Sequence, residues 1–194
     1  MDSSAAGQRS RKPRSDGIRN YQLILEVAKQ VVAGSGPDFT LEEVSRRSKV
    51  GIGTVYRHFP TKLDLSTAIY NDQLEDLLRR LKIVGESHDQ ATGLLSWLRE
   101  VADRLVTYQG LVSCFDLAQA SAPETKFWQW KTELLRTGNE IVQILREEGR
   151  IRPGVSMGDL LGLVNALAMA SGSGPNALEK VHLWLDTMEK GLSL

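Results

Sequence analysis

The sequence predicts an all-α protein with a small N-terminal helical unit and a larger C-terminal helical unit. Apolar residues recur three or four positions apart along most of the chain, which is the spacing of one helix face. The apolar–polar alternation that is typical of strands is missing from the sequence, as is any internal repeat. With 194 residues, of which 41% are hydrophobic, the chain is long enough to bury a core.

The N-terminal end predicts a tail followed by one helix. Residues 1–17 are rich in Ser, Arg and Gly, which indicates a flexible basic tail. From Ile18 to Ala33, apolar residues stand at positions 24, 27, 28, 31 and 32, as on one face of a helix. The Gly-Ser-Gly-Pro run that follows is expected to end this helix.

Two short helices are expected next. Thr40 stands three residues before Glu43, the spacing of a capping box, in which the threonine hydroxyl and the glutamate each accept a backbone N–H from the other residue. The first helix cannot extend far past Lys49, because glycines follow, and the second runs from about Gly51 to His58. Two short helices joined by a tight turn form a helix-turn-helix unit.

The apolar residues of this unit predict its inner face. We expect Leu41 and Val44 to point inward from the first short helix, and Val55 and Phe59 from the end of the second. A further helix is expected over Thr61–Lys82, where Thr61 and Asp64 repeat the capping-box spacing.

The remainder of the chain predicts four more helices from their apolar stripes. The stripes consist of Leu94, Leu98, Val101, Leu105 and Tyr108; then Phe127, Trp130, Leu134, Ile141, Ile144 and Leu145 within residues 123–148; then the nearly continuous apolar run 157–171; and finally Leu178, Val181, Leu185 and Met188 within residues 176–190.

Composition excludes several classes of protein. Cys114 is the single cysteine and no pair of the three histidines has metal-ligand spacing, so we expect no disulfide, no metal site and no cofactor. Cys114 is expected to be a small buried residue rather than a reactive thiol. No apolar run approaches the ~18 residues of a membrane span, and the first residues lack the apolar stretch of a secretory signal. A reducing cytoplasm is the expected location.

Charge is unevenly distributed along the chain. Residues 1–60 contain ten Lys/Arg and six Asp/Glu, a balance of +4, whereas residues 61–194 contain 14 and 18, a balance of −4. A basic front on an acidic remainder suggests a polyanionic partner for the front alone. The alternative is a solvated basic tail without a partner.

The stretch Thr40–Lys62, TLEEVSRRSKVGIGTVYRHFPTK, resembles the DNA-binding segment of the TetR family of bacterial transcriptional regulators. Its core, V-G-x-G-T-hydrophobic-Y-x-H-F-P-x-K, has many fixed features. The chemistry of these residues supports the resemblance, because such a turn delivers the end of the second helix to a major groove. Glycines there let the backbone approach DNA, and free N–H groups at a helix start favour a phosphate.

The resemblance implies a fold and a set of contacts. The fold is an N-terminal three-helix helix-turn-helix domain over residues 18–63 and a C-terminal helical ligand-binding and dimerisation domain over residues 64–194. The DNA contacts are expected from Thr40, Lys49, Gly51, Ile52, Gly53, Thr54, Tyr56, Arg57, His58 and Lys62.

Two positions depart from the family pattern. Many members have Ala-Gly where this chain has Ser48-Lys49, and a left-handed non-glycine residue at the turn costs roughly 1 kcal/mol. A contact between Lys49 and a phosphate would offset that cost. Ile52 is apolar at a groove-facing position, so it either meets thymine methyl groups or packs inward, three residues before Val55.

The resemblance also implies an effector pocket and a dimer face in the C-terminal part. The candidates for the pocket are Trp97, Phe115, Trp128, Met157 and Met169, with plain core as the alternative. The expected dimer face is the small-residue helix 157–171 with the final helix, through Gly162, Ala166, Leu178, Val181 and Leu185; burial within one subunit is the alternative. Trp128 and Trp130 are two residues apart on a helix and cannot face the same way.

These observations predict a homodimeric, sequence-specific DNA-binding transcriptional regulator, a repressor controlled by a small-molecule effector. Its partners would be double-stranded operator DNA, the effector and a second copy of the chain. The alternatives are a ligand-independent or architectural DNA-binding protein, and a helical small-molecule-binding protein or enzyme. An enzyme would need a catalytic group of residues in 83–194, and the sequence offers none.

Overall fold

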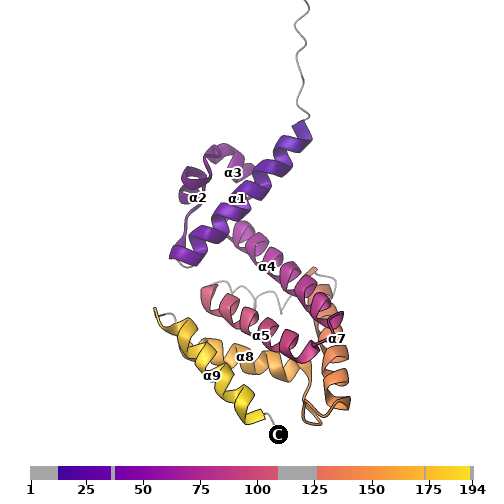
Figure 1. The fold of residues 1–194 in the computed structure, drawn as a ribbon. Coiled ribbons are helices and arrows are strands. Elements are labelled where there is room, and N and C mark those ends of the chain that lie inside the picture. The colour runs from indigo at the N-terminus through magenta and orange to yellow at the C-terminus, as the bar shows by residue number, and fades with distance from the viewer. Residues whose placement is uncertain (1–12, 36–37, 109–125, 173, 193–194) are drawn as a thin grey trace, which may run out of the picture.

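The computed structural model describes residues 13–35, 38–108, 126–172 and 174–192, and every regular element in them is a helix (Figure 1). In chain order the helices are α1 (Pro13–Ser35), α2 (Leu41–Ser48), α3 (Ile52–His58), α4 (Lys62–Gly85), α5 (Gln90–Thr107), α7 (Lys126–Glu147), α8 (Met157–Ser171) and α9 (Ala177–Leu192). The predicted all-α class is therefore confirmed.

The molecule has two hydrophobic cores, and α4 contributes to both. Helices α1, α2 and α3 lie at one end of the molecule, α5, α7, α8 and α9 lie at the other, and α4 runs between them (Figure 1). The first turns of α4 place Leu65 and Ile69 in the first core, while its second half places Leu77, Leu78 and Leu81 in the second.

The first core is small and closed. It is formed by side chains that are 8% exposed or less: Ile24, Leu25, Ala28, Val31, Val32, Phe39, Leu41, Val44, Val50, Val55, Phe59, Leu65 and Ile69. Leu41, Val44, Val55 and Phe59 are among them, which confirms the inner face that the sequence predicts. Outside this core, the Lys29 ammonium of α1 lies 2.9 Å from the Asp72 carboxylate of α4, so an ion pair also joins the two helices.

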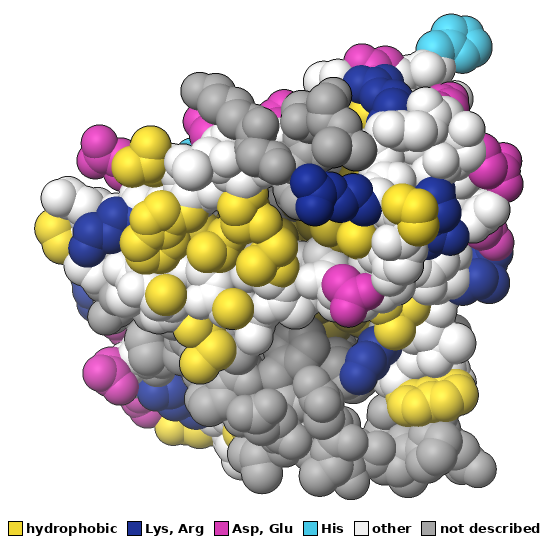
Figure 2. All heavy atoms as spheres, turned by 90° about the horizontal axis from the view of Figure 1, so that it is seen from below, with side chains coloured by type: hydrophobic (Ala, Val, Ile, Leu, Met, Phe, Trp, Pro, Cys, Tyr) yellow, Lys and Arg dark blue, Asp and Glu magenta, His cyan; other side chains and the backbone are white. Residues whose placement is uncertain are grey.

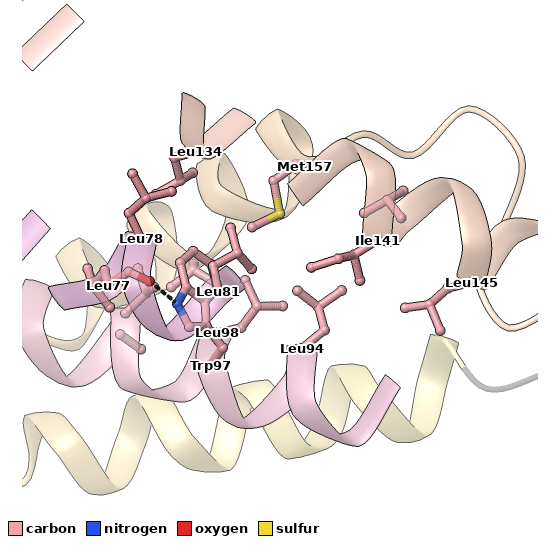
Figure 3. Close-up of a cluster of buried hydrophobic side chains, with 14 of the residues drawn as sticks. Leu77, Leu78, Leu81, Leu94, Trp97, Leu98, Leu134, Ile141, Leu145 and Met157 are labelled. Atoms are coloured by element: carbon pink, nitrogen blue, oxygen red, sulfur yellow. Dashed lines mark hydrogen bonds between the residues drawn. The ribbon is translucent and has the colours of Figure 1, made fainter. Parts of the chain in front are cut away.

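The second core surrounds Trp97 of α5. Figure 3 shows this ring among leucines of α4, α5 and α7, with its indole N–H donating to the carbonyl oxygen of Leu77 at 2.8 Å. Nearby, α7 and α8 approach closely at Gly138, where an added Cβ would stand 2.3 Å from Cγ of the fully buried Met157. Gly138 is thus required by the packing of Met157.

Of the two capping boxes that the sequence predicts, the structure shows one in full and the other in part. Thr61 and Asp64 form the complete box at the start of α4. At α2, Thr40 Oγ1 accepts the N–H of Glu43 at 3.1 Å. The Glu43 carboxylate, however, binds Arg47 one turn further along, at 2.7 Å. An unpredicted box, Ser156 with Asp159, begins α8.

Two expectations about the helices were wrong. Helix α1 begins at Pro13 rather than Ile18, so it includes part of the predicted tail. Proline fits the first turn of a helix, because the N–H it lacks has no intrahelical partner there. Ile144 lies on the predicted inner stripe of α7 but is 41% exposed, because α7 packs on α4 and α8 through the neighbouring Ile141 and Leu145.

Candidate nucleic-acid interface and effector cavity

The turn between α2 and α3 is held by two serine side chains. Lys49 has φ 57° and ψ 22°, the left-handed conformation that usually favours glycine. The Ser45 hydroxyl donates to the carbonyl oxygen of Val50 at 2.7 Å, and the Ser48 hydroxyl accepts the N–H of Val50 at 3.3 Å. These bonds fix the chain on both sides of Lys49 and thereby offset the strain of a non-glycine residue.

The two faces of α3 differ sharply. Val55 is fully buried, and Phe59, which caps the helix, is buried too, whereas Ile52 and Tyr56 remain 39% and 45% exposed. Arg57 is exposed as well. Of the two alternatives for Ile52, the inward one does not match its exposure, so its side chain is available to a partner.

The glycines of α3 have no role in packing. A Cβ at Gly51 or Gly53 would meet no atom within 4 Å, and neither glycine has a positive φ. Any residue therefore fits both positions in the isolated chain, and Ala would be the better helix former at Gly53. A requirement for glycine here points to an external surface that comes close to the backbone.

Cationic side chains lie on α2, at the turn and on α3. Within the described residues, the side chains of Arg46, Lys49 and Arg57 have no carboxylate within 4.0 Å. The Glu42 carboxylate of α2 accepts the Tyr56 hydroxyl at 2.8 Å, and this bond lowers the pKa of Glu42 and raises the pKa of Tyr56. The surface can therefore receive an anion.

His58 and Lys62 also take part in packing. The His58 ring meets Tyr21 of α1 at 6.0 Å between centroids, in an edge-to-face arrangement. The Lys62 ammonium lies 5.1 Å from the centre of the Phe39 ring, within the range of a cation–π contact. Both residues connect the α3–α4 junction to the rest of the first core.

A cavity of about 470 Å³ lies between α4, α5, α7 and α8. Its walls are mostly leucine and aromatic side chains, and include Trp97 and Trp130. The polar side chains that line it are Tyr70, Gln73, Arg104, Tyr108, Lys131 and Asn165. Such a cavity suits a small organic molecule, because apolar walls bury the ligand and a few polar groups orient it.

An exposed apolar surface covers α8 and α9. It consists of Leu163, Ala166, Met169 and Ala170 on α8 and of Leu178 and Leu183 on α9, all of them exposed. The C-terminal end of the molecule accordingly shows a concentration of apolar side chains in Figure 2. Exposed apolar residues grouped in this way mark a surface that meets a partner.

Two family models together cover most of the chain. The model of the bacterial regulatory proteins of the tetR family matches residues 24–69, and the model of the C-terminal domain of SbtR-like transcriptional regulators matches residues 89–194, which is more than half of the chain. The chain belongs to the TetR family. The resemblance first noted in Thr40–Lys62 thus extends, in the second model, to the C-terminal helices.

Individual relatives of this TetR-family chain agree with the models. An HTH-type transcriptional regulator of Staphylococcus aureus is 34% identical over 70 residues, which cover 34% of this chain and 36% of that protein. The chain therefore spans only about a third of the length of that curated relative.

Two solved TetR structures have the same fold. The regulator from Mycobacterium vanbaalenii is 26% identical with a TM-score of 0.65, and the match covers 94% of this chain and 100% of that one. The regulator from Streptomyces coelicolor is 24% identical with a TM-score of 0.68, and the match covers 89% of this chain and 98% of that one.

The structure separates the residues that the sequence predicts for the effector pocket. Trp97 lines the cavity of this TetR-family chain, but Met157 is buried in the core behind it, and Trp128 and Met169 are 47% and 68% exposed outside it. Phe115 lies outside the described residues. The sequence prediction for Met157, Trp128 and Met169 is therefore not supported by their positions.

Several lining residues were missed by sequence reasoning. The spacing of Trp128 and Trp130 indicated that only one of them faces inward, and Trp130 is the one that lines the cavity. Arg104 and Lys131 have no sequence signal of their own, because charged residues on an amphipathic helix usually face solvent. A cation at the edge of an apolar stripe, as Arg104 is beside Leu105, was the only clue.

The predicted dimer residues are divided between surface and interior. Ala166 and Leu178 are exposed on the apolar surface of α8 and α9. Val181 is fully buried in the chain's own second core, and Leu185 packs partly against that core, so these two follow the alternative of burial within one subunit. Gly162 is exposed and also lines the cavity. The exposed residues that were missed are Leu163, Met169 and Leu183.

Two other kinds of feature, a metal site and a membrane span, are absent from the described residues. Across the described ranges, there is no group of three or more His, Cys, Asp or Glu side chains that could hold a metal ion. None of the described helices combines the length and apolar character needed to span a membrane.

Proposed function

We propose that this TetR-family regulator is an operator-binding repressor that acts as a homodimer and releases or seats its DNA in response to a small molecule. The N-terminal end of α3 enters the major groove in this proposal. The proposal rests chiefly on Gly51 and Gly53, which the fold does not require, in a helix-turn-helix unit whose Arg46, Lys49 and Arg57 have no described carboxylate partner.

The groove contacts are assigned from the exposed face of α3. Ile52, Gly53 and Tyr56 meet base edges, with Ile52 against thymine methyl groups. Arg46, Lys49 and Arg57 meet phosphates and so position the helix without reading sequence. To donate its hydroxyl proton to DNA, Tyr56 must leave Glu42, because one proton cannot serve both acceptors.

The test is selection of bound sequences from random double-stranded DNA, followed by affinity measurements on the selected site. A palindromic site with half-sites about one helical turn apart is expected. Gly53→Leu should abolish binding without loss of folding. A chain that binds random DNA as tightly as the selected site is an architectural DNA-binding protein, and this outcome would contradict the proposal.

The dimer is assigned to the exposed apolar surface of α8 and α9. Leu183 is 62% exposed there, and an arginine in its place would bury an unpaired charge between two subunits. Ile83 on α4 is similarly exposed, at 59%, but lies outside this surface, so it is the matched control. Leu183→Arg should give monomers by light scattering, and Ile83→Arg should not. If both variants remain dimers, the interface does not lie on the exposed apolar surface of α8 and α9.

A further inference from the structure

The cavity between α4, α5, α7 and α8 has an excess of positive charge. Two cationic side chains, Arg104 and Lys131, line it, and no aspartate or glutamate is among the described residues of its wall. The rest of the wall is mostly apolar. A ligand that satisfies both features is apolar over most of its surface and negatively charged at one end.

The Arg104 guanidinium stands between the cavity and α4. It donates to the carbonyl oxygen and the side-chain oxygen of Gln73, at 3.1 and 2.8 Å, and to the Asp76 carboxylate. Its side chain is only 19% exposed. A guanidinium has five N–H donors, and these described partners use three of them, so donors remain for a further acceptor.

Asp76 does not depend on Arg104 alone. Arg79 and Arg80 also bind this carboxylate, with Arg80 Nε at 2.9 Å from Oδ2. Three guanidinium groups thus surround one carboxylate, and Arg80 is shared with Glu100. If Arg104 turns to a ligand, Asp76 keeps two cationic partners, so the exchange leaves no buried charge unpaired.

Lys131 provides the second charge at the edge of the cavity. It is exposed on α7, and the described residues place no carboxylate within 4.0 Å of it. It lies one residue from Trp130, whose indole N–H donates to the carbonyl oxygen of Leu74 and which also lines the cavity. An ammonium beside an apolar wall attracts anions and repels amines.

We propose that the effector of this regulator is an apolar organic anion, such as a carboxylate with an aliphatic or aromatic body, bound through Arg104 and Lys131. This inference rests on the proposed effector-controlled function and names the chemical class of the ligand. Binding also connects the ligand to α4, because the Arg104 guanidinium contacts Gln73 and Asp76 of that helix. An anion that competes with these contacts changes how α4 is held.

The experiment compares ligands of one shape and three charges. The probes are decanoate, 1-decanol and decylamine, and a second series of 1-naphthylacetate, 2-(1-naphthyl)ethanol and 2-(1-naphthyl)ethylamine. Binding to the full chain is followed by tryptophan fluorescence, since Trp97 and Trp130 line the cavity, and by calorimetry. The acid should bind more tightly than the alcohol by about tenfold or more, because hydrogen bonds to charged groups are the strong ones, and the amine should bind most weakly.

Variants test whether Arg104 and Lys131 cause the preference for the acid. Arg104→Gln and Lys131→Gln should each reduce the acid-to-alcohol ratio of affinities by about tenfold. Arg136→Gln, which removes a cation from the same helix as Lys131 but outside the cavity, should leave the ratio unchanged. The ratio is taken within each variant, so a general loss of stability cancels. If Arg104→Gln does not fold, the exposed Lys131 still carries the test.

The outcomes are distinguishable. The anion assignment is overturned if neither series shows a preference for the acid, or if the preference survives both variants. Neither result affects the DNA-selection test. Acid selectivity in a protein that selects no DNA sequence would contradict the proposed function and leave the anion site standing. Acid binding that shifts affinity for the selected DNA supports both.

Discussion

The glycines at the start of α3 and the glycine of α7 lie in opposite surroundings, one open and the other crowded. Around Gly51 and Gly53 the chain itself places nothing within reach of a Cβ, whereas at Gly138 a Cβ would collide with Met157. The C-terminal region thus uses glycine to admit its own core, and in the proposed function the helix-turn-helix region uses it to admit an external surface. One residue type therefore reports function in one region and packing in the other.

The two cores also differ in how tightly they are filled. The first core closes around Phe39, Val55 and Phe59 and leaves Ile52 and Tyr56 exposed on the outside of α3. The second core leaves a cavity of about 470 Å³ beside Trp97. A regulator that reads DNA at one end and a small molecule at the other needs this contrast.

The largest effect is expected from truncation in the first core. Phe59→Ala should lower the free energy of unfolding by about 3–5 kcal/mol, because it deletes a buried aromatic ring. Tyr56→Ala, three residues earlier on the exposed face, should cost less than about 1 kcal/mol but still weaken DNA binding. Chemical unfolding and affinity for the selected DNA measure both. Equal stability losses in the two variants would remove the distinction between inner and outer faces of α3.

The two kinds of glycine form the next test. Gly138→Ala should destabilise the protein by about 1–3 kcal/mol through overpacking against Met157, and the penalty should shrink in a Met157→Ala background. Gly53→Ala should leave stability unchanged or raise it by up to about 1 kcal/mol, while DNA affinity falls. Thermal melts of the wild type, Gly138→Ala, Met157→Ala, the double variant and Gly53→Ala measure stability, and DNA affinity is measured for Gly53→Ala. A destabilised Gly53→Ala variant with normal DNA affinity would reverse the assignment.

Charge at the junction of the regions gives a pH-dependent effect. Burial raises the pKa of Asp76, but hydrogen bonds from Arg104 and Arg80 outweigh it and lower the pKa from 3.8 to about 2. The folded pKa is depressed, so the stabilisation is present above about pH 4 and is lost as the pH falls towards 2. Asp76→Asn should cost about 2 kcal/mol at pH 6 and almost nothing near pH 2.

A surface ion pair is the control for Asp76. Asp186 is 51% exposed and pairs with Arg99 between α9 and α5, so Asp186→Asn should cost less than about 1 kcal/mol at either pH. Urea unfolding at several pH values compares the two variants. A cost for Asp76→Asn that is independent of pH would show that the carboxylate acts through packing rather than through charge.

The smallest effect is expected at the turn. Lys49→Gly should raise stability by up to about 1 kcal/mol, because glycine adopts a left-handed φ without strain. Lys49→Ala keeps the strain and should bring no gain. Both variants should make the dependence of log affinity on log salt shallower by about 0.9 if Lys49 meets one phosphate. An unchanged slope would leave Lys49 a purely structural residue.

The sequence predicted the helix-turn-helix region far better than the C-terminal region. Local signals decide the former: Thr40 caps α2, the glycines end it, and Val55 and Phe59 fall on one face. The exception was the turn itself, where the sequence showed an ill-suited Lys49 but not the Ser45 and Ser48 bonds that support it. Side-chain bonds to a turn depend on geometry that spacing alone does not give.

For the cavity and the dimer surface, the sequence predicted the helices that form them but not which residues line the cavity or face a partner. Aromatic and methionine side chains look alike in sequence whether they fill a core, line a cavity or face a partner. Met157 and Met169 were assigned alike, yet one is fully buried and the other is 68% exposed. The choice depends on which helices surround each one, and that is set by contacts between segments far apart in the chain.

The shared use of α4 has a consequence for how the protein is made. Leu65 and Ile69 complete the first core, so α1, α2 and α3 lack part of their interior until the start of α4 has left the ribosome. By then the same helix has begun to present Leu77 and Leu81, whose partners on α5 and α7 are still to be synthesised. Until α5 and α7 follow, the second half of α4 has its apolar face exposed to solvent.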